Sequence, residues 1–222
     1  MVTFSLADRP WRNLRWLVLA PHPDDETLGA GALISQTAAS GHFAALVYLT
    51  DGSGSHADSA GLAALRKREA AAALCLLTSS RGSRPIHLNW KDAAPAAPES
   101  RTFARTASVL GALCRRLRVD AIAVTARHEP HCDHAAAASI AYAVRATAKR
   151  RLIVAEYCVW AEVPQGRDYR KLGTRSMLAG KRRQALRAHR SQLTAFRGPG
   201  FRLPPDRRRM PAADTLFLRR FP

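Results

Sequence analysis

The stretch LAPHPDDETLGAGALI, residues 19–34, places a dense cluster of ionisable side chains directly behind a short apolar run. The cluster consists of His22, Asp24, Asp25 and Glu26, and no opposite charge lies beside it in the sequence. Such a cluster is costly to remove from water. The apolar run has the length of a strand and the segment behind it has helical composition, so we expect the ionisable groups at a strand-to-helix turn.

The same alternation of short apolar runs and longer helical segments continues along the chain. We predict strands at 15–20, 43–50, 84–90, 120–126 and 151–160, and helices at 26–39, 60–78, 99–117 and 133–149. The strands are almost continuously apolar, which is typical of a sheet that is covered on both faces. This order predicts an α/β fold: a Rossmann-like three-layer sandwich with a mostly parallel sheet and right-handed crossovers.

The 222 residues suit a single domain that spans the whole chain, and we find no internal repeat. Residues 91–100 and 198–209 have the composition of loops, and residues 214–221 are expected to form an edge strand. From about residue 181 the chain continues as a basic C-terminal segment.

The charge balance is strongly basic, with 35 Lys and Arg against 17 Asp and Glu and a formal net charge of +18. A field of that sign favours phosphorylated or otherwise acidic partners such as nucleotide-linked sugars, anionic lipid headgroups or nucleic acid. A compositional preference for arginine without a dedicated partner explains the excess equally well.

Two basic runs lie in the C-terminal segment, at residues 181–190 and 207–209. Each is interpreted as a solvated face or as a site for substrate phosphate. No base-reading motif or aromatic interleaving accompanies them, so a specific nucleic-acid partner is not expected. Trp11 and Trp16, which lie among arginines, leave transient contact with an anionic membrane open, although a partly packed lead-in is the simpler interpretation.

The four cysteines, Cys75, Cys114, Cys132 and Cys158, form no CxxC pair and no disulfide framework. The N-terminus has no signal-peptide core, and no apolar run approaches the length of a membrane span. A cytoplasmic location is therefore expected, whereas the oligomeric state is left open.

Polar clusters follow three of the predicted strands, namely PHPDDE at 21–26, DGSGSH at 51–56 and RHEPHCDH at 127–134. Open α/β sheets build their sites beyond the carboxyl ends of the strands. The three clusters, although far apart in sequence, are therefore expected to meet at one edge of the sheet.

The residue types in these clusters predict a catalytic metal site. His22 and Asp25 can reach one ion from the same turn, and His134 can supply a third ligand. Such a set with one open position is typical of catalytic zinc, which lowers the pKa of bound water and polarises a carbonyl. Asp24, whose side chain can point elsewhere at the turn, is the candidate general base.

The cluster at 131–134 offers a second imidazole with a different role. If His134 binds the metal, His131 can face the oxyanion that develops on the substrate. Asp133 could then hydrogen-bond the His131 ring and keep it oriented and protonated.

These motifs also have simpler interpretations. A helix N-terminus accommodates one acidic residue well but three consecutive ones poorly, although Glu26 could cap the helix or support a ligand. Gly29 and Gly31 are better explained by close packing than by a dinucleotide site, because the acids before them repel pyrophosphate. Arg66 and Glu69, at i and i+3, could form a surface ion pair.

Taken together, these motifs resemble the PIG-L/LmbE-like zinc-dependent de-N-acetylases. Residues 21–26 match the family signature P-H-P-D-D-E, and residues 131–134 match H-P-D-H except for Cys132 in place of Pro. Thr50-Asp51-Gly52, the Arg66/Glu69 pair and His189-x-Ser191-Gln192 also fit, so the resemblance extends over residues 15–193.

The resemblance implies an LmbE-like fold with one zinc ion per chain, although another divalent metal could serve. It implies His22, Asp25 and His134 as metal ligands and Asp24 as the base. It implies that His131 stabilises the oxyanion or protonates the leaving amine, aided by Asp133. Arg66 and Asp51 are implied near the substrate, where Arg66 could instead hold the site loop.

The expected reaction removes the N-acetyl group from an N-acetylglucosamine-type amino sugar in a glycoconjugate, which can be anionic or lipid-linked. One alternative is a metal-dependent hydrolase of another amide or of a phosphoester. An alternative of a different class is a non-catalytic basic module that binds nucleic acid or membrane.

Overall fold

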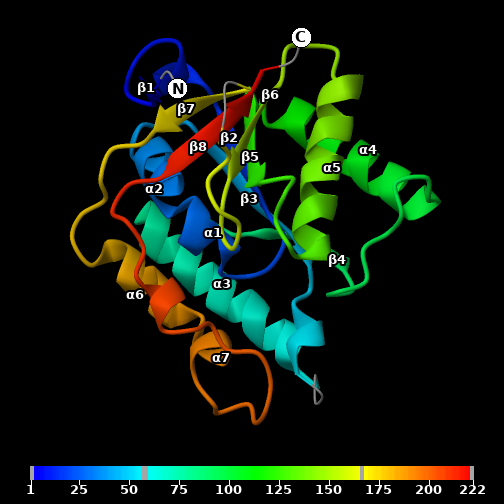
Figure 1. The fold of residues 1–222 in the computed structure, drawn as a ribbon, viewed down its shortest axis with the longest axis vertical. Coiled ribbons are helices and arrows are strands. Elements are labelled where there is room, and N and C mark those ends of the chain that lie inside the picture. The colour runs from blue at the N-terminus through cyan, green and yellow to red at the C-terminus, as the bar shows by residue number, and fades with distance from the viewer. Residues whose placement is uncertain (1–2, 57–59, 166–167, 221–222) are drawn as a thin grey trace.

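A computed structural model describes residues 3–56, 60–165 and 168–220, which build one eight-stranded sheet in the order β1-β7-β8-β6-β5-β2-β3-β4 (Figure 1). The strands are β1 (Thr3–Ser5), β2 (Trp16–Ala20), β3 (Phe43–Thr50), β4 (Ile86–Trp90), β5 (Ala121–Thr125), β6 (Ile153–Tyr157), β7 (Tyr169–Gly173) and β8 (Thr215–Arg219). β8 runs antiparallel to β6 and β7, while the other pairs are parallel. The prediction of a mostly parallel sheet is confirmed.

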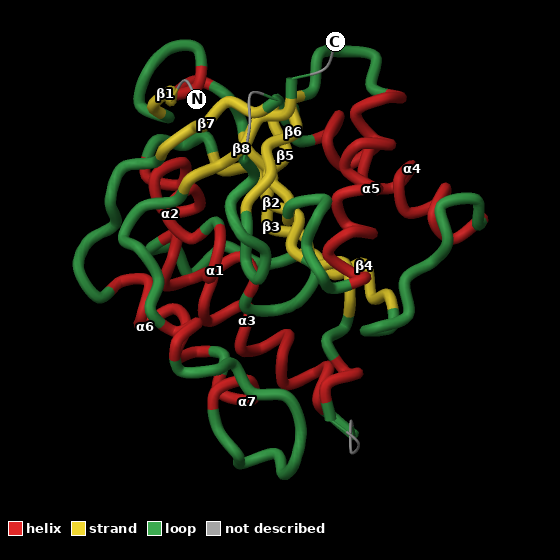
Figure 2. The backbone as a smooth tube through the Cα atoms, in the orientation of Figure 1, coloured by secondary structure: helices red, strands yellow, loops and turns green. Residues whose placement is uncertain are grey.

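Helices cover both faces of this sheet, as Figure 2 shows. They are α1 (Asp25–Gly29), α2 (Gly31–Ala39), α3 (Leu62–Thr78), α4 (Arg101–Arg116), α5 (Cys132–Thr147), α6 (Lys181–Ala188) and α7 (Arg190–Leu193). Helices α2, α3 and α6 lie on one side, and α4 and α5 lie on the other.

The alternating side chains of the central strands supply a core to each side. Val18 of β2 packs in the cluster with Leu74 of α3, whereas Leu19 packs in the opposite cluster with Leu110 of α4. A strand that is buried on both faces must be apolar at successive positions, which explains the continuous apolarity of residues 16–20. The three-layer sandwich is therefore confirmed.

The predicted helix at 26–39 is divided into α1 and α2 at Ala30, whose φ of −134° is not helical. Gly29 lies against β6, because a Cβ at this position would overlap the ring of Tyr157. Close packing therefore accounts for this glycine. The break lets α1 form a short turn of its own directly behind the ionisable cluster.

The expectation of an edge strand at 214–221 is wrong in its placement. β8 inserts between β6 and β7, and the edges of the sheet are β1 and β4. β1 and β7, which no apolar run announces, extend the sheet beyond the five strands predicted from periodicity. Residue 221 lies outside the described residues.

The N-terminal aromatic residues differ in exposure. Trp16 is buried in the core, and Trp11 packs its ring against Phe4 at a centroid distance of 5.8 Å. Neither observation indicates contact with a membrane. Among the described helices, none has the length and apolarity needed to cross a bilayer. All four cysteines are free thiols.

Candidate metal-dependent active site

The loops behind the carboxyl ends of β2, β3, β4, β5 and β6 converge on one cavity of about 210 Å³. Its lining includes His22, Asp24, Asp25, Arg66, Asp92, His131, His134, Trp160, Gln192 and Phe201. Because these strands run parallel, their ends meet at one edge of the sheet. The clusters that lie far apart in sequence are thus brought together.

The turn behind β2 has a strained backbone. Asp24 adopts φ 117°, which non-glycine residues rarely adopt, and its backbone N–H donates to Glu26 Oε2 at 3.0 Å. The amide of Gln192 donates to the carbonyl of Pro23 in the same turn. These contacts hold Asp24 and Asp25 on the cavity wall, where both carboxyl groups are buried.

Asp25 joins two of the imidazoles. Its Oδ2 lies 3.2 Å from His22 Nδ1 and 3.2 Å from His134 Nε2. Burial alone would raise the pKa of Asp25, but His134 and His22 outweigh it and hold this pKa far below its usual range. Asp25 is therefore an anion that faces two imidazole nitrogens.

Two overlapping groups of side chains could hold a metal ion. One contains His22, His131 and His134, and the other contains His22, Asp92, His131 and Asp133, with ligand atoms within 4.8 Å of one another in each group. The imidazoles come from the turns behind β2 and β5. The predicted ligand Asp25 and the exposed Cys132 belong to neither group.

Glu129 supports His134 from behind the cavity. Its carboxylate lies 3.3 Å from His134 Nδ1 and accepts backbone N–H groups of Val159, Trp160 and Ala161. Metal-binding histidines usually present their second nitrogen to such a group, which fixes the ring and the tautomer. Asp25 and Glu129 outweigh burial and raise the pKa of His134 to about 9.

Asp133 does not orient His131 in the expected way. Its Oδ2 lies 4.0 Å from His131 Nδ1, beyond hydrogen-bonding distance, and instead accepts from His22 Nε2 at 3.0 Å and from the Ala93 N–H at 2.8 Å. The backbone N–H of Asp133 donates to His131 Nδ1, because His131 caps the N-terminus of α5. The first turn of the helix, and not the carboxylate, fixes this ring.

His131 is also not held in the protonated form. Burial and the neighbouring His22 and His134 lower its pKa. In the neutral ring Nδ1 accepts the helix N–H, so the proton lies on Nε2. The ring therefore presents a hydrogen-bond donor at Nε2.

The two adjacent aspartates differ in their electrostatics. Burial and the charge of Asp25 raise the pKa of Asp24 to about 7, whereas the pKa of Asp25 is lowered. Groups whose pKa values are driven apart in this way are typical of acid–base sites. Asp25 is the more strongly anionic of the two, and Asp24 is the one able to accept a proton near neutral pH.

The segment His189-Arg190-Ser191-Gln192 contacts two buried carboxylates beside the site. His189 Nε2 lies 3.1 Å from Glu26 Oε1, and Ser191 donates to Glu69 from both its N–H and its hydroxyl, at 2.9 and 2.6 Å. Glu26 therefore forms a buried pair with His189. Glu69 accepts hydrogen bonds from Ser191. This contact, and not a surface ion pair with Arg66, explains the position of Glu69.

Arg66 and Asp51 organise the loop behind β3. The buried Arg66 guanidinium donates to the Gly52 carbonyl and, at 2.7 Å, to Ser55 Oγ. Asp51 accepts from the N–H and hydroxyl of Ser53 at 2.9 and 2.8 Å. Arg66 lines the cavity, but Asp51 is not among the lining residues.

Four residues of the site were not singled out from the sequence: Asp92, Glu129, Trp160 and Phe201. Asp92 is the second residue after a predicted strand, and Glu129 lies inside RHEPHCDH, so position alone could have suggested both. Trp160 and Phe201 pack edge to face with a centroid distance of 6.0 Å, a tertiary contact without a local sequence signal.

Comparison with protein families gives a match to PIG-L, described as GlcNAc-PI de-N-acetylase, over residues 17–145, more than half of the chain. No curated protein matches the sequence.

Solved structures share the fold. An N,N'-diacetylchitobiose deacetylase from Pyrococcus horikoshii has 22% identity and a TM-score of 0.65, covering 84% of this chain and 74% of its own. The zinc-inhibited form of teicoplanin deacetylase has 17% identity and a TM-score of 0.63, covering 93% and 98%. A 4-carboxy-2-hydroxymuconate hydratase from Pseudomonas putida KT2440 has 16% identity and a TM-score of 0.53, covering 100% and 97%. Because a hydratase shares the fold, the reaction must be argued from the site.

Proposed function

Because this chain belongs to the PIG-L family and is an N-deacetylase, we propose that it removes the acetyl group from an N-acetylglucosamine-type sugar with the aid of one zinc ion. The observation that carries the proposal is the meeting of Asp25 with the imidazoles of His22 and His134 beside the buried Asp24.

The donor set fits a zinc ion. His22, Asp25 and His134 would hold it, because two nitrogens and one oxygen leave an open position for water or substrate. The His134 ring is fully buried, and both its nitrogens lie close to carboxylates without making an aligned hydrogen bond. When bound, zinc supplies a lowered water pKa and polarisation of the acetamide carbonyl.

The side chains of this chain would then divide the proton and charge transfers. Asp24 takes the proton from the attacking water, a role that its raised pKa suits. His131 donates from Nε2 to the oxyanion of the tetrahedral intermediate, because its Nδ1 is occupied by the N–H of Asp133. The proton held at Asp24 passes to the departing amine.

The cavity wall supports a sugar as the substrate. Trp160 and Phe201 offer apolar ring surface next to the acidic cluster, and sugar rings bind by combining such surface with polar contacts. The Arg207 guanidinium lies 5.4 Å from the Trp160 ring centroid. A phosphate- or lipid-linked anionic aglycone beyond Trp160 would meet this charge.

The test is acetate release from a panel of N-acetylhexosamine conjugates, neutral and phosphate-linked, with phosphate release measured in parallel. We expect acetate alone, zinc-dependent turnover, and a preference for the anionic conjugates that declines with salt. Phosphate release would support a phosphoesterase instead. A protein that binds zinc but releases neither product would leave a binding module as the answer.

A further inference from the structure

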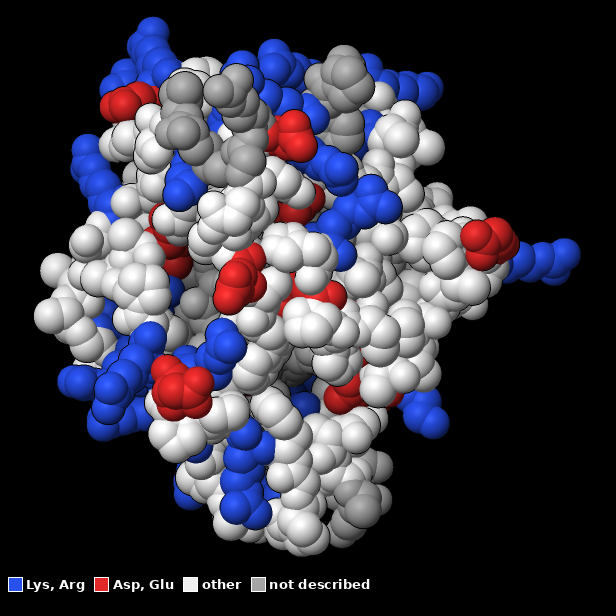
Figure 3. Space-filling model, viewed as in Figure 1, with Lys and Arg blue, Asp and Glu red and all other residues white. Residues whose placement is uncertain are grey.

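A cavity lined with arginines lies at the end of the sheet opposite the candidate active site. Its volume is about 590 Å³, and Trp11 and apolar residues of β6 and β8 complete its wall. Its arginines are Arg145, Arg150, Arg151, Arg170, Arg219 and Arg220. Figure 3 shows basic side chains along the upper edge of the molecule, where Figure 1 places the adjoining ends of β6 and β8.

The topology of the sheet concentrates these arginines. β6 begins at this edge, the antiparallel β8 ends there, and α5 ends beside them, so that three segments bring arginines to one place. None of the described residues that line the cavity is acidic. Asp120 neutralises part of this charge through an ion pair with Arg150 at 2.8 Å.

Three of these guanidinium groups have no hydrogen-bond or ion-pair partner among the described residues. Within the described residues, the exposed side chains of Arg151, Arg219 and Arg220 make no hydrogen bond or ion pair. A concave surface lined by charge of one sign focuses the field and attracts counter-ions. The cavity is therefore suited to an anion that reaches several arginines at once.

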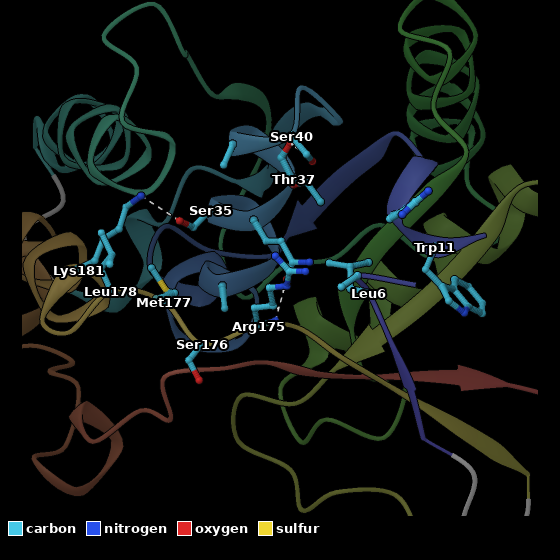
Figure 4. A pocket seen from close by; sticks show the side chains of 15 residues that line it. Leu6, Trp11, Ser35, Thr37, Ser40, Arg175, Ser176, Met177, Leu178 and Lys181 are labelled. Atoms are coloured by element: carbon cyan, nitrogen blue, oxygen red, sulfur yellow. Dashed lines mark hydrogen bonds between the residues drawn. The ribbon is translucent and has the colours of Figure 1, made fainter. Parts of the chain in front are cut away.

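A neighbouring cavity of about 600 Å³ shows the contrast (Figure 4). Trp11 lines both cavities. In this second cavity Lys181 Nζ already donates to Ser35 Oγ at 2.9 Å and to Ser79 Oγ at 3.2 Å. Its ammonium group donates to the protein's own hydroxyls, whereas the side chains of Arg151, Arg219 and Arg220 in the arginine cavity make no such bond to another described residue.

We propose that the arginine cavity binds an oligophosphate, a linear chain of phosphate groups such as inorganic polyphosphate or the triphosphate of a nucleotide. A planar guanidinium group can donate two parallel hydrogen bonds to the oxygens of one phosphate. Several arginines therefore match several linked phosphates. The volume falls in the range of small-molecule sites. A flat bilayer cannot enter such a hollow.

This site is independent of the proposed deacetylase reaction. The arginines lie at the start of β6, and Trp160 of the active-site cavity lies beyond its end. The five residues of β6 alone span roughly 13 Å, since four steps of about 3.3 Å separate its first and last residues. An anion bound among the arginines would therefore not touch the candidate catalytic groups.

The first experiment measures binding to the wild-type chain by calorimetry, with tripolyphosphate, ATP, orthophosphate and sulfate at equal ionic strength. We expect tripolyphosphate and ATP to bind at least about tenfold more tightly than orthophosphate or sulfate. Equal affinity for tripolyphosphate and ATP would assign recognition to the phosphate chain, and tighter ATP binding would add a contact to the nucleoside. Both results support the proposal.

The second experiment locates the site with charge-matched variants. Arg151→Gln combined with Arg219→Gln should weaken tripolyphosphate binding at least about tenfold, whereas Arg101→Gln combined with Arg105→Gln, exposed on α4, should change it less than about twofold. Thermal melting and deacetylase activity verify folding, and the Arg151→Gln single variant substitutes for a double variant that fails to fold.

Three results would overturn the proposal. Orthophosphate could bind as tightly as tripolyphosphate, or both double variants could lose affinity equally. Duplex DNA or phosphatidylserine vesicles could bind where tripolyphosphate does not, with equal loss in the two double variants. The last result would assign the positive charge to a diffuse surface for macromolecules.

Discussion

The two ends of the sheet carry opposite chemistry on the same strands. Behind the carboxyl end of β6 lies a cavity with buried carboxylates and imidazoles, and before its amino end lies one lined by arginines. The chain has a net charge of +18, yet its candidate active site has the acidic groups of a cation site. Net charge therefore describes the surface that a partner meets first and not the local site.

The two ends also differ in how their charges are satisfied. At the carboxyl end nearly every ionisable side chain contacts another. For example, Asp25 contacts one nitrogen of His134, and Glu129 contacts the other. At the amino end several guanidinium groups face solvent. Changes at the carboxyl end should therefore propagate through neighbours, while changes at the amino end should act one charge at a time.

We expect the largest effect from substitutions of the metal ligands. These substitutions also show which imidazoles hold the ion. Asp25→Asn should abolish both zinc binding and acetate release, because a ligand that joins His22 and His134 is lost. His131→Asn should keep the zinc and lose turnover. Metal content by mass spectrometry after dialysis, together with acetate release, checks both variants.

The opposite pattern, in which His131→Asn loses the metal and Asp25→Asn keeps it, would assign the ion to the group of three imidazoles. Tripolyphosphate binding serves as the control for both variants. It should stay unchanged, because the arginine cavity lies at the other end of β6.

Asp24→Asn should lower kcat about 10²- to 10⁴-fold with the zinc content unchanged, because the amide cannot accept the proton. Asn is the appropriate replacement, since it tolerates the left-handed φ of 117° at this position better than Ala does. Steady-state kinetics with a melting curve measures the effect. Full activity in a folded, zinc-loaded variant would remove Asp24 from the mechanism.

Glu129→Gln should weaken zinc binding about 10- to 100-fold, because the neutral amide orients His134 less strongly while it still accepts the backbone N–H groups. Competition with a zinc chelator gives the affinity. Glu162→Gln, on an exposed neighbour, is the matched control and should leave zinc affinity unchanged. Equal affinities in the two variants would show that Glu129 supports only the loop behind β6.

The sequence allowed the carboxyl end to be predicted much better than the amino end. His22, Asp25 and His134 follow two apolar runs, and parallel strands bring such positions together whatever the details of packing. The Asp133 contact with His22 was not predicted, because it depends on how α5 lies against the Ala93 loop.

The amino end depends on long-range pairing that leaves no local pattern. Arg219 and Arg220 meet Arg151 only because β8 inserts between β6 and β7, whereas the sequence favoured an edge strand.

At the carboxyl end, Glu129 and Asp92 are single acids in loops, where residue type alone does not separate a ligand support from a solvated side chain.

We expect the smallest effect from replacing His87, which belongs to neither end of the sheet. This replacement distinguishes the acid sensitivity of an ordinary buried histidine from that of the candidate active site. His87 lies on the edge strand β4, stacked on Tyr48 with a centroid distance of 5.3 Å. Burial and the charge of Lys67 lower the pKa of His87 to about 4 from its usual value of about 6.5. The unfolded chain therefore binds this proton first, and the neutral ring contributes stability that is lost as the pH falls from about 6.5 to about 4.

In His87→Gln this loss is absent, so the free energy of unfolding of the variant should gain about 1–2 kcal/mol relative to wild type between pH 6.5 and pH 4, after allowance for partial exposure. Urea denaturation at a series of pH values measures the difference, with the offset at pH 8 as the reference for lost stacking. A wild-type curve that runs parallel to the curve of the variant between pH 6.5 and pH 4 would exclude His87 as a source of acid sensitivity and leave only that of the carboxyl end. There Asp25 and Glu129, whose pKa values are lowered by their imidazole neighbours against the effect of burial, lose their contribution only at a lower pH.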